Sequence, residues 1–176
     1  MAMIRWCKSV VLFSGLLAVV APVYADEPLV TWPPGWQVEV LAQGDAGSAV
    51  SRQRAVKNDA QGAPLMVMEL TMTRVQSGHQ VNLEAVLLEM RKSVQKDFFQ
   101  GGYQSVCNRI HSSNLSRLPA LETTCTITQN GRHVLSQTLV AAVDEDKAYV
   151  LSYAGQAEAY KASQNEIEAT RNGLQL

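Results

Sequence analysis

The sequence has little excess charge, no regular glycine or proline pattern, and no long apolar run beyond its first 21 residues. Its 15 basic and 16 acidic residues leave a formal net charge of −1, so it lacks the basic surface that nucleic acid or an anionic membrane attracts. Hydrophobic residues make up 47% of the 176, which is too many for an intrinsically disordered chain. The 11 glycines and 6 prolines follow no period, and this excludes a collagen-like protein.

The local motifs of common enzymes are also missing. The chain has no G-x-S-x-G, no H-E-x-x-H and no P-loop. The glycine-containing stretch 44–48 lacks the Lys-Ser/Thr pair that holds phosphate and magnesium, so we interpret it as a surface turn. The histidines are isolated, at positions 79, 111 and 133. We therefore assign no catalytic residue, no metal ligand and no cofactor, and we do not expect an enzyme.

The N-terminal 25 residues have the pattern of a signal peptide. Arg5 and Lys8 precede an apolar stretch of 13 residues, 9–21, which is shorter than the roughly 20 residues of a membrane-spanning helix. Pro22 and the Val23-Tyr24-Ala25 cleavage pattern argue against an uncleaved anchor. We expect residues 1–25 to be removed and residues 26–176 to form one domain, periplasmic or secreted, without membrane insertion.

Cysteine is scarce, and its placement agrees with export. Of the 3 cysteines, Cys7 leaves with the signal peptide, so the mature chain keeps Cys107 and Cys125. In an oxidising compartment this pair predicts one intramolecular disulfide. Free thiols, or a zinc site formed with His111 and His133, are alternatives, but the spacing matches no tight zinc knuckle.

The first half of the mature chain predicts strands followed by a helix. Strands are indicated over 36–41, with Trp36, Val38 and Val40 on one face, over 50–57 and over 65–74. The apolar face of the third strand is formed by Met66, Met68, Leu70 and Met72. From Asn82, a good N-cap residue, to Phe99 the apolar residues recur every three or four positions, and glycines 101 and 102 end this helix.

The second half predicts a hairpin meander and a last helix. Strands are expected over 103–110, 121–128, 133–143 and 148–154, with a loop over 111–119. Asn130-Gly131 is a strong signal for a type I′ turn, because both central residues of that turn need positive φ. Residues 157–172 are rich in Ala, Glu, Lys and Gln and predict a helix with a possible break near Ser163. Short turns between strands favour antiparallel pairing, so the fold class is α+β, with about six or seven strands covered by two main helices.

This layout resembles the PsbP-like (DcrB-like) fold. The resemblance lies in Pro34-Gly35-Trp36 opening the first strand, the central capped helix, the meander, and the stretch 148–154 (AYVLSYA) that runs into the terminal helix. It implies a small exported bacterial protein with an α/β sandwich. Proteins of that fold mostly bind other proteins and share no catalytic residues, so the resemblance supplies no active site.

Two functions of different classes remain open. The first is a non-catalytic binding or accessory protein of the cell envelope, with an unidentified protein partner. The second is an exported hydrolase whose site assembles from dispersed residues. On the helix from Asn82 to Phe99, Leu88 and Phe99 lie about 140° and about 160° from Leu83, away from the apolar stripe. Either Phe99 folds under the Gly101-Gly102 turn and Leu88 is a single exposed leucine, or both belong to a docking surface.

The cleavage pattern gives the first testable prediction. Protein recovered from the periplasm or the medium should begin at Asp26, and its intact mass should correspond to residues 26–176. A mass that still includes residues 1–25 would contradict the assignment of a cleaved signal peptide.

Overall fold

The computed structural model describes residues 27–39, 41, 49–76 and 78–176. The expected signal peptide and the turn at 44–48 therefore lie outside the described residues. The strands are β1 (Gln37–Glu39), β2 (Val50–Asn58), β3 (Pro64–Arg74), β4 (Gln104–Cys107), β5 (His111–Leu115), β6 (Leu118–Gln129), β7 (Arg132–Asp144) and β8 (Lys147–Gln156). The helices are α1 (Leu83–Gln100), α2 (Ala157–Ala162) and α3 (Gln164–Asn172).

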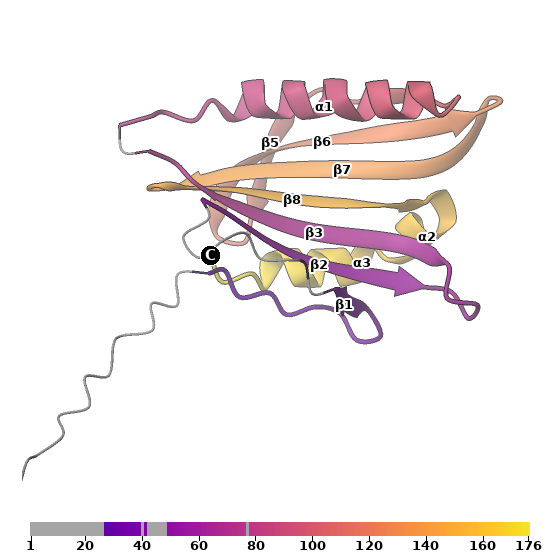
Figure 1. Cartoon of the computed structure of the whole chain (residues 1–176), viewed down its shortest axis with the longest axis horizontal. Coiled ribbons are helices and arrows are strands. Elements are labelled where there is room, and N and C mark those ends of the chain that lie inside the picture. Colours follow the sequence, from indigo (N-terminus) through magenta and orange to yellow (C-terminus); the bar gives the residue numbers. More distant parts are fainter. Residues whose placement is uncertain (1–26, 40, 42–48, 77) are drawn as a thin grey trace, which may run out of the picture.

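The strands form one antiparallel sheet in the order β1-β2-β3-β8-β7-β6-β4, with β5 also paired to β6 (Figure 1). Helix α1 packs over β4, β6 and β7, whereas α2 packs over β3, β7 and β8. The expected α+β fold is confirmed. The sheet has 8 strands rather than six or seven, and the expected last helix is two helices that meet at Ser163.

Two apolar clusters lie on opposite faces of the sheet, because neighbouring residues of a strand point to opposite sides. Leu139 and Ala141 of β7 pack with Leu87 of α1. Val140 and Ala142 belong to the larger cluster, which contains Ile167 of α3. The expected alternation of β3 and β8 supplies seven of the sixteen buried residues of that larger core, namely Met66, Met68, Leu70, Met72, Tyr149, Leu151 and Tyr153.

Local signals set the ends of α1 and the central hairpin as expected. The Asn82 side chain accepts a hydrogen bond from the Ala85 N–H at 3.0 Å, which satisfies one of the unpaired donors of the first helical turn. Gly101 caps the C-terminus. Between β6 and β7, Asn130 and Gly131 have φ of 52° and 74°, as a type I′ turn requires.

The first strand differs from the prediction. Trp36 lies outside β1 and is 7% exposed, whereas Val38 is 56% exposed. The cause is the turn before the strand, in which the Trp36 N–H donates to the Pro33 carbonyl at 3.2 Å. This turn directs the indole into the larger core, and β1 remains a three-residue edge strand.

The predicted loop over 111–119 is also wrong, because residues 111–115 form β5. Leu115 pairs with Leu118 across a two-residue turn in which Ser116 has φ 53°. The expected strand 103–110 is shorter and ends at Cys107. Asn108 follows this end, and its side-chain oxygen accepts from the Thr124 N–H at 2.8 Å. The chain therefore bends at 108–110 and continues along β6 as β5.

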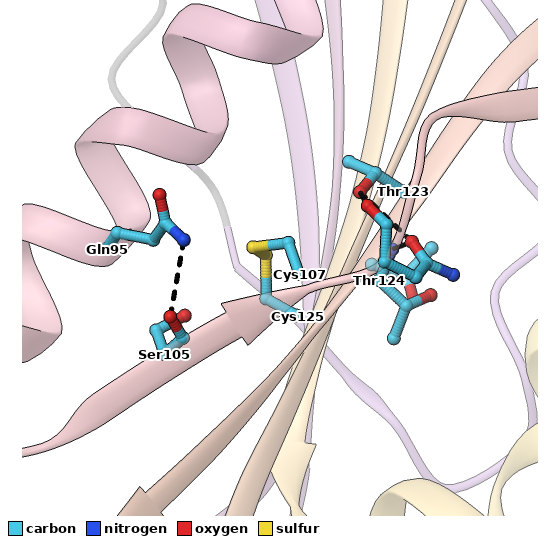
Figure 2. Close-up of a disulfide and its surroundings, with 8 residues drawn as sticks. Gln95, Ser105, Cys107, Thr123, Thr124 and Cys125 are labelled. Atoms are coloured by element: carbon cyan, nitrogen blue, oxygen red, sulfur yellow. Dashed lines mark hydrogen bonds between the residues drawn. A yellow bond between two sulfur atoms is a disulfide. The ribbon is translucent and has the colours of Figure 1, made fainter.

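A disulfide joins Cys107 of β4 to Cys125 of β6, and the two residues are direct partners in the strand pairing. Figure 2 shows the bond beside the Gln95 side chain of α1, whose amide donates to the Ser105 carbonyl at 3.2 Å. The bond and this contact hold the short edge strand β4 between β6 and α1.

Replacing both cysteines by alanine should lower the free energy of unfolding by about 2–4 kcal/mol, because the disulfide restricts the unfolded chain. The fold should persist, since a core of this size does not depend on one covalent link. Chemical denaturation monitored by circular dichroism measures the change. Two alkylatable thiols in the unreduced, exported wild-type protein would contradict the disulfide itself.

Candidate functional site

The outer face of α1 exposes two large apolar side chains, Leu88 and Phe99, with exposed fractions of 41% and 78%. Their neighbours in sequence point the other way. Leu87 is fully buried against β7, and the Phe98 ring packs edge-to-face on Tyr103 with centroids 5.9 Å apart. The interpretation in which Phe99 folds under the glycine turn is therefore wrong, because Phe98 takes that place.

We call the surface that carries these two residues the outer α1 surface, and define it by Leu88, Lys92 and Phe99. Eleven residues separate Leu88 from Phe99, which is about 16 Å along a helix axis. Lys92 lies between them and forms an exposed ion pair with Glu89 at 2.5 Å. The surface thus consists of two apolar side chains separated by a charged one, on a helix whose opposite face is fixed in the core.

A partly buried polar cluster connects α3 to β5 and β6. Arg171 Nη1 donates to Glu122 Oε2 at 2.8 Å, and both side chains are 14% exposed. Arg171 also donates to the Ser113 hydroxyl and to the Asn114 carbonyl, and the Ser113 hydroxyl donates to Glu122 at 2.7 Å. Each partner here is satisfied by another protein group, so this cluster positions α3 and leaves no reactive group aimed at solvent.

A second polar cluster holds the other end of α3 to the N-terminal segment. Glu166 Oε2 accepts from Lys57 Nζ at 2.7 Å and from Trp36 Nε1 at 3.1 Å. Lys57 also donates to the buried Ser163 hydroxyl at 3.2 Å. The hydrogen bond from Lys57 lowers the pKa of the Glu166 carboxyl below its ordinary value of 4.5, because it stabilises the charged form.

The rings of Tyr153 on β8 and Tyr160 on α2 are stacked, with centroids 5.9 Å apart. The Tyr160 hydroxyl lies 2.5 Å from Thr138 Oγ1, which in turn lies 2.6 Å from Thr124 Oγ1. Burial raises the pKa of both Tyr153 and Tyr160, so both phenols stay protonated at neutral pH. The two rings pack against each other, and the Tyr160 hydroxyl shares a hydrogen bond with Thr138, so neither phenol is poised as a base.

One arrangement superficially resembles a nucleophile with its base. His133 Nε2 lies 2.9 Å from the Ser136 hydroxyl, and it also lies 3.0 Å from the Leu135 carbonyl. Ser136 is buried at 5% exposure. It does not line the open cavity of about 420 Å³ at this end of the sheet, whereas His133 does. A nucleophilic hydroxyl must reach its substrate, and this one does not open onto the cavity.

The other candidate residues stay apart. His79 and His111 are exposed and lie on different segments, and the pair Cys107 and Cys125 is in the disulfide. Among the described residues, no three His, Cys, Asp or Glu side chains come together as a metal site. In the same part of the chain no helix is long and apolar enough to cross a membrane.

Comparison of the structure with solved proteins shows which fold it has. The solution structure of the cyanobacterial PsbP protein, CyanoP, from Synechocystis sp. PCC 6803 superposes with a TM-score of 0.58 at 11% identity, covering 92% of this chain and 99% of that one. LpqN, involved in cell envelope biogenesis of Mycobacterium tuberculosis, gives 0.51 at 13% identity, covering 84% and 81%. The chain thus has a PsbP-like fold, as the sequence resemblance predicted.

The family follows from the sequence itself. Residues 27–176 match the family model described as "Domain of unknown function (DUF4946)", and the chain belongs to that family. A search of curated proteins gives no match.

The Glu166 cluster generates a pH prediction. A folded-state pKa below the unfolded value stabilises the protein at pH above about 4.5, and this contribution disappears as pH falls through the lower, folded-state pKa. The variant Glu166→Gln should therefore be less stable than wild type at pH 7, and the difference should shrink on acidification below pH 4.5.

The matched control is Glu168→Gln, an exposed carboxylate on the same helix that forms no side-chain bond within the described part of the chain. The free energy of unfolding of Glu168→Gln should stay close to that of wild type at every pH. Chemical denaturation at several pH values measures the free energy of unfolding of both variants. A loss of stability in Glu166→Gln that does not change with pH would contradict the role of the Lys57 hydrogen bond.

Proposed function

We propose that this chain is an exported, non-catalytic accessory protein of the cell envelope that binds a protein partner through the outer α1 surface. The observation that carries the proposal is the exposure of Leu88 and Phe99 on a helix whose other face is fixed in the core. Protein contact surfaces combine large apolar side chains with polar and charged ones. Phenylalanine in particular is enriched in such surfaces.

Three further features support the proposal. The signal-peptide pattern of residues 1–25 and the disulfide between Cys107 and Cys125 both suit an oxidising compartment outside the cytoplasm. The fold is shared with LpqN, a protein involved in cell envelope biogenesis. The partly buried polar clusters around Arg171 and Glu166 connect structural elements to one another, so their chemistry is accounted for by packing.

The alternative is an exported hydrolase with a site assembled from dispersed residues, and the pair His133 and Ser136 is the contact described above that most resembles a nucleophile with its base. The burial of Ser136 and the proximity of His133 Nε2 to the Leu135 carbonyl count against it. Binding therefore explains more of the described surface than catalysis does.

The substitution Leu88→Glu should leave the melting temperature within about 2 °C of wild type, because the side chain is already exposed. It should also weaken capture of the partner from envelope extracts by about tenfold or more, as loss of an apolar contact in an interface does. The double variant Leu88→Glu/Phe99→Glu should reduce capture further. Thermal unfolding and quantitative mass spectrometry measure the two effects.

The matched control is Val38→Glu, on the edge strand β1 at the far side of the sheet, where the side chain is 56% exposed, a value between those of Leu88 and Phe99. It should not change capture. A large loss of stability in Leu88→Glu would show that Leu88 belongs to the core, and equal loss of capture in Val38→Glu would remove the outer α1 surface from the proposal.

A further inference from the structure

The cavity of about 420 Å³ at one end of the sheet carries a second inference, independent of the outer α1 surface. It lies where the β6–β7 hairpin meets the end of β8 and the beginning of α2. Its volume is within the range of small-ligand sites. The lining residues are Tyr103, Gln129, Arg132, His133, Val134, Leu135, Gln156, Ala157 and Glu158.

A β-bulge builds this cavity. The pairing of β6 with β7 shifts so that Ile127 faces Leu135 while Thr128 faces His133, which leaves Val134 as an extra residue on β7. In a regular strand alternate residues point to opposite faces, yet the consecutive residues 132–135 all line the cavity. Bulges redirect side chains in this way and are frequent beside binding sites.

The cavity is lined by two residues of opposite charge, both of them exposed to solvent. Arg132 comes from β7 and Glu158 from the first turn of α2. Neither side chain forms a hydrogen bond or ion pair with any other residue in the described part of the chain. This contrasts with Arg171 and Glu166, whose charged groups are paired within the fold. An unpaired guanidinium is suited to a carboxylate, and an unpaired carboxylate to an ammonium group.

The remaining lining suits a peptide between those two charges. The side-chain amide of Gln129 offers a donor and an acceptor that match a peptide bond. The Gln156 amide nitrogen donates to the Pro64 carbonyl at 3.4 Å, and its oxygen remains as an acceptor. Tyr103 is held by its edge-to-face contact with Phe98, and it offers an aromatic surface beside the apolar side chains of Val134 and Leu135. Apolar walls with a few polar groups are the usual composition of ligand pockets.

We propose that this cavity binds a short peptide with both termini free, its carboxylate on Arg132 and its ammonium group on Glu158. Binding here requires neither a partner protein nor the outer α1 surface. Failure of this inference would therefore leave the proposed function in place, and the reverse also holds.

The test uses the mature protein labelled with ¹⁵N and titrated with the dipeptide alanyl-alanine, observed by backbone amide shifts. Shifts should concentrate on residues that line the cavity. Arg132→Gln should weaken binding of the free dipeptide by about tenfold, as loss of one charge-assisted contact does. It should not further weaken binding of the C-terminal amide, because that form already lacks the carboxylate that Arg132 binds. Glu158→Gln should likewise weaken binding of the free dipeptide but not of the N-acetylated form, which already lacks the ammonium group.

The control is Arg109→Gln, an exposed arginine outside the cavity lining, which should bind as wild type does. O-phosphoethanolamine, which carries the charges of a lipid headgroup, is titrated in parallel. Tighter binding of that compound than of alanyl-alanine would overturn the peptide assignment. The site itself would be refuted by absence of cavity shifts up to about 10 mM dipeptide, a range that detects millimolar affinity, or by equal binding of the doubly blocked dipeptide.

Discussion

Burial of β7 on both faces is the constraint on which the rest of the structure depends. Residues 138–142 are buried without interruption, because α1 covers one side of this strand and α2 packs over the other. Leu139 and Ala141 therefore pack in one apolar cluster, while Val140 and Ala142 pack in the second, on the opposite face. A strand covered on both faces is a near-continuous apolar run, and the two helix layers are placed relative to each other through it. The stripe of α1 that meets β7 leaves Leu88 and Phe99 on the outside.

The terminal helices are held differently from α1. Helix α1 packs chiefly through apolar side chains, with Gln95 as its polar contact to β4. Helix α3 combines the buried Ile167 with charged contacts near both ends, Glu166 to Lys57 and Arg171 to Glu122. These ion pairs connect it to segments more than 45 residues away in sequence, with separations of 109 and 49. The Arg171–Glu122 pair is the less exposed of the two. Replacing one partner there leaves the other charge unpaired in a partly desolvated position, so the orientation of α3 is most sensitive to substitutions of that pair.

Much of the fold follows from local patterns in the sequence, and the failures have a common cause. The methionine alternation of β3, the Asn82 cap and the Asn130-Gly131 turn are local signals, and each appears as expected. Strand β5 could not be predicted from its own sequence, because residues 111–114 (HSSN) are polar and show no apolar alternation. They are held as a strand by pairing with β6 and by a contact with Arg171. The burial of Trp36 depends on the turn at Pro33 and on Glu166, 130 residues further along the chain.

Some of the candidate sites could be predicted from local sequence patterns and others could not. The disulfide could be predicted because only two cysteines remain after residue 25, and the outward positions of Leu88 and Phe99 follow from helix geometry. The cavity could not be predicted, because a bulge at Val134 and the beginning of α2 create it together. Periodicity alone does not reveal a one-residue shift in strand pairing.

The central claim, that the outer α1 surface contacts a protein partner, is tested most directly by photocrosslinking in living cells. A photoreactive phenylalanine derivative placed at Leu88 or Phe99 should give one discrete crosslinked species at each position, containing the same partner. The same derivative at Val38, which is exposed on the opposite edge of the sheet, should not give that species. No crosslink at Leu88 and Phe99, or an identical species from all three positions, would contradict the account.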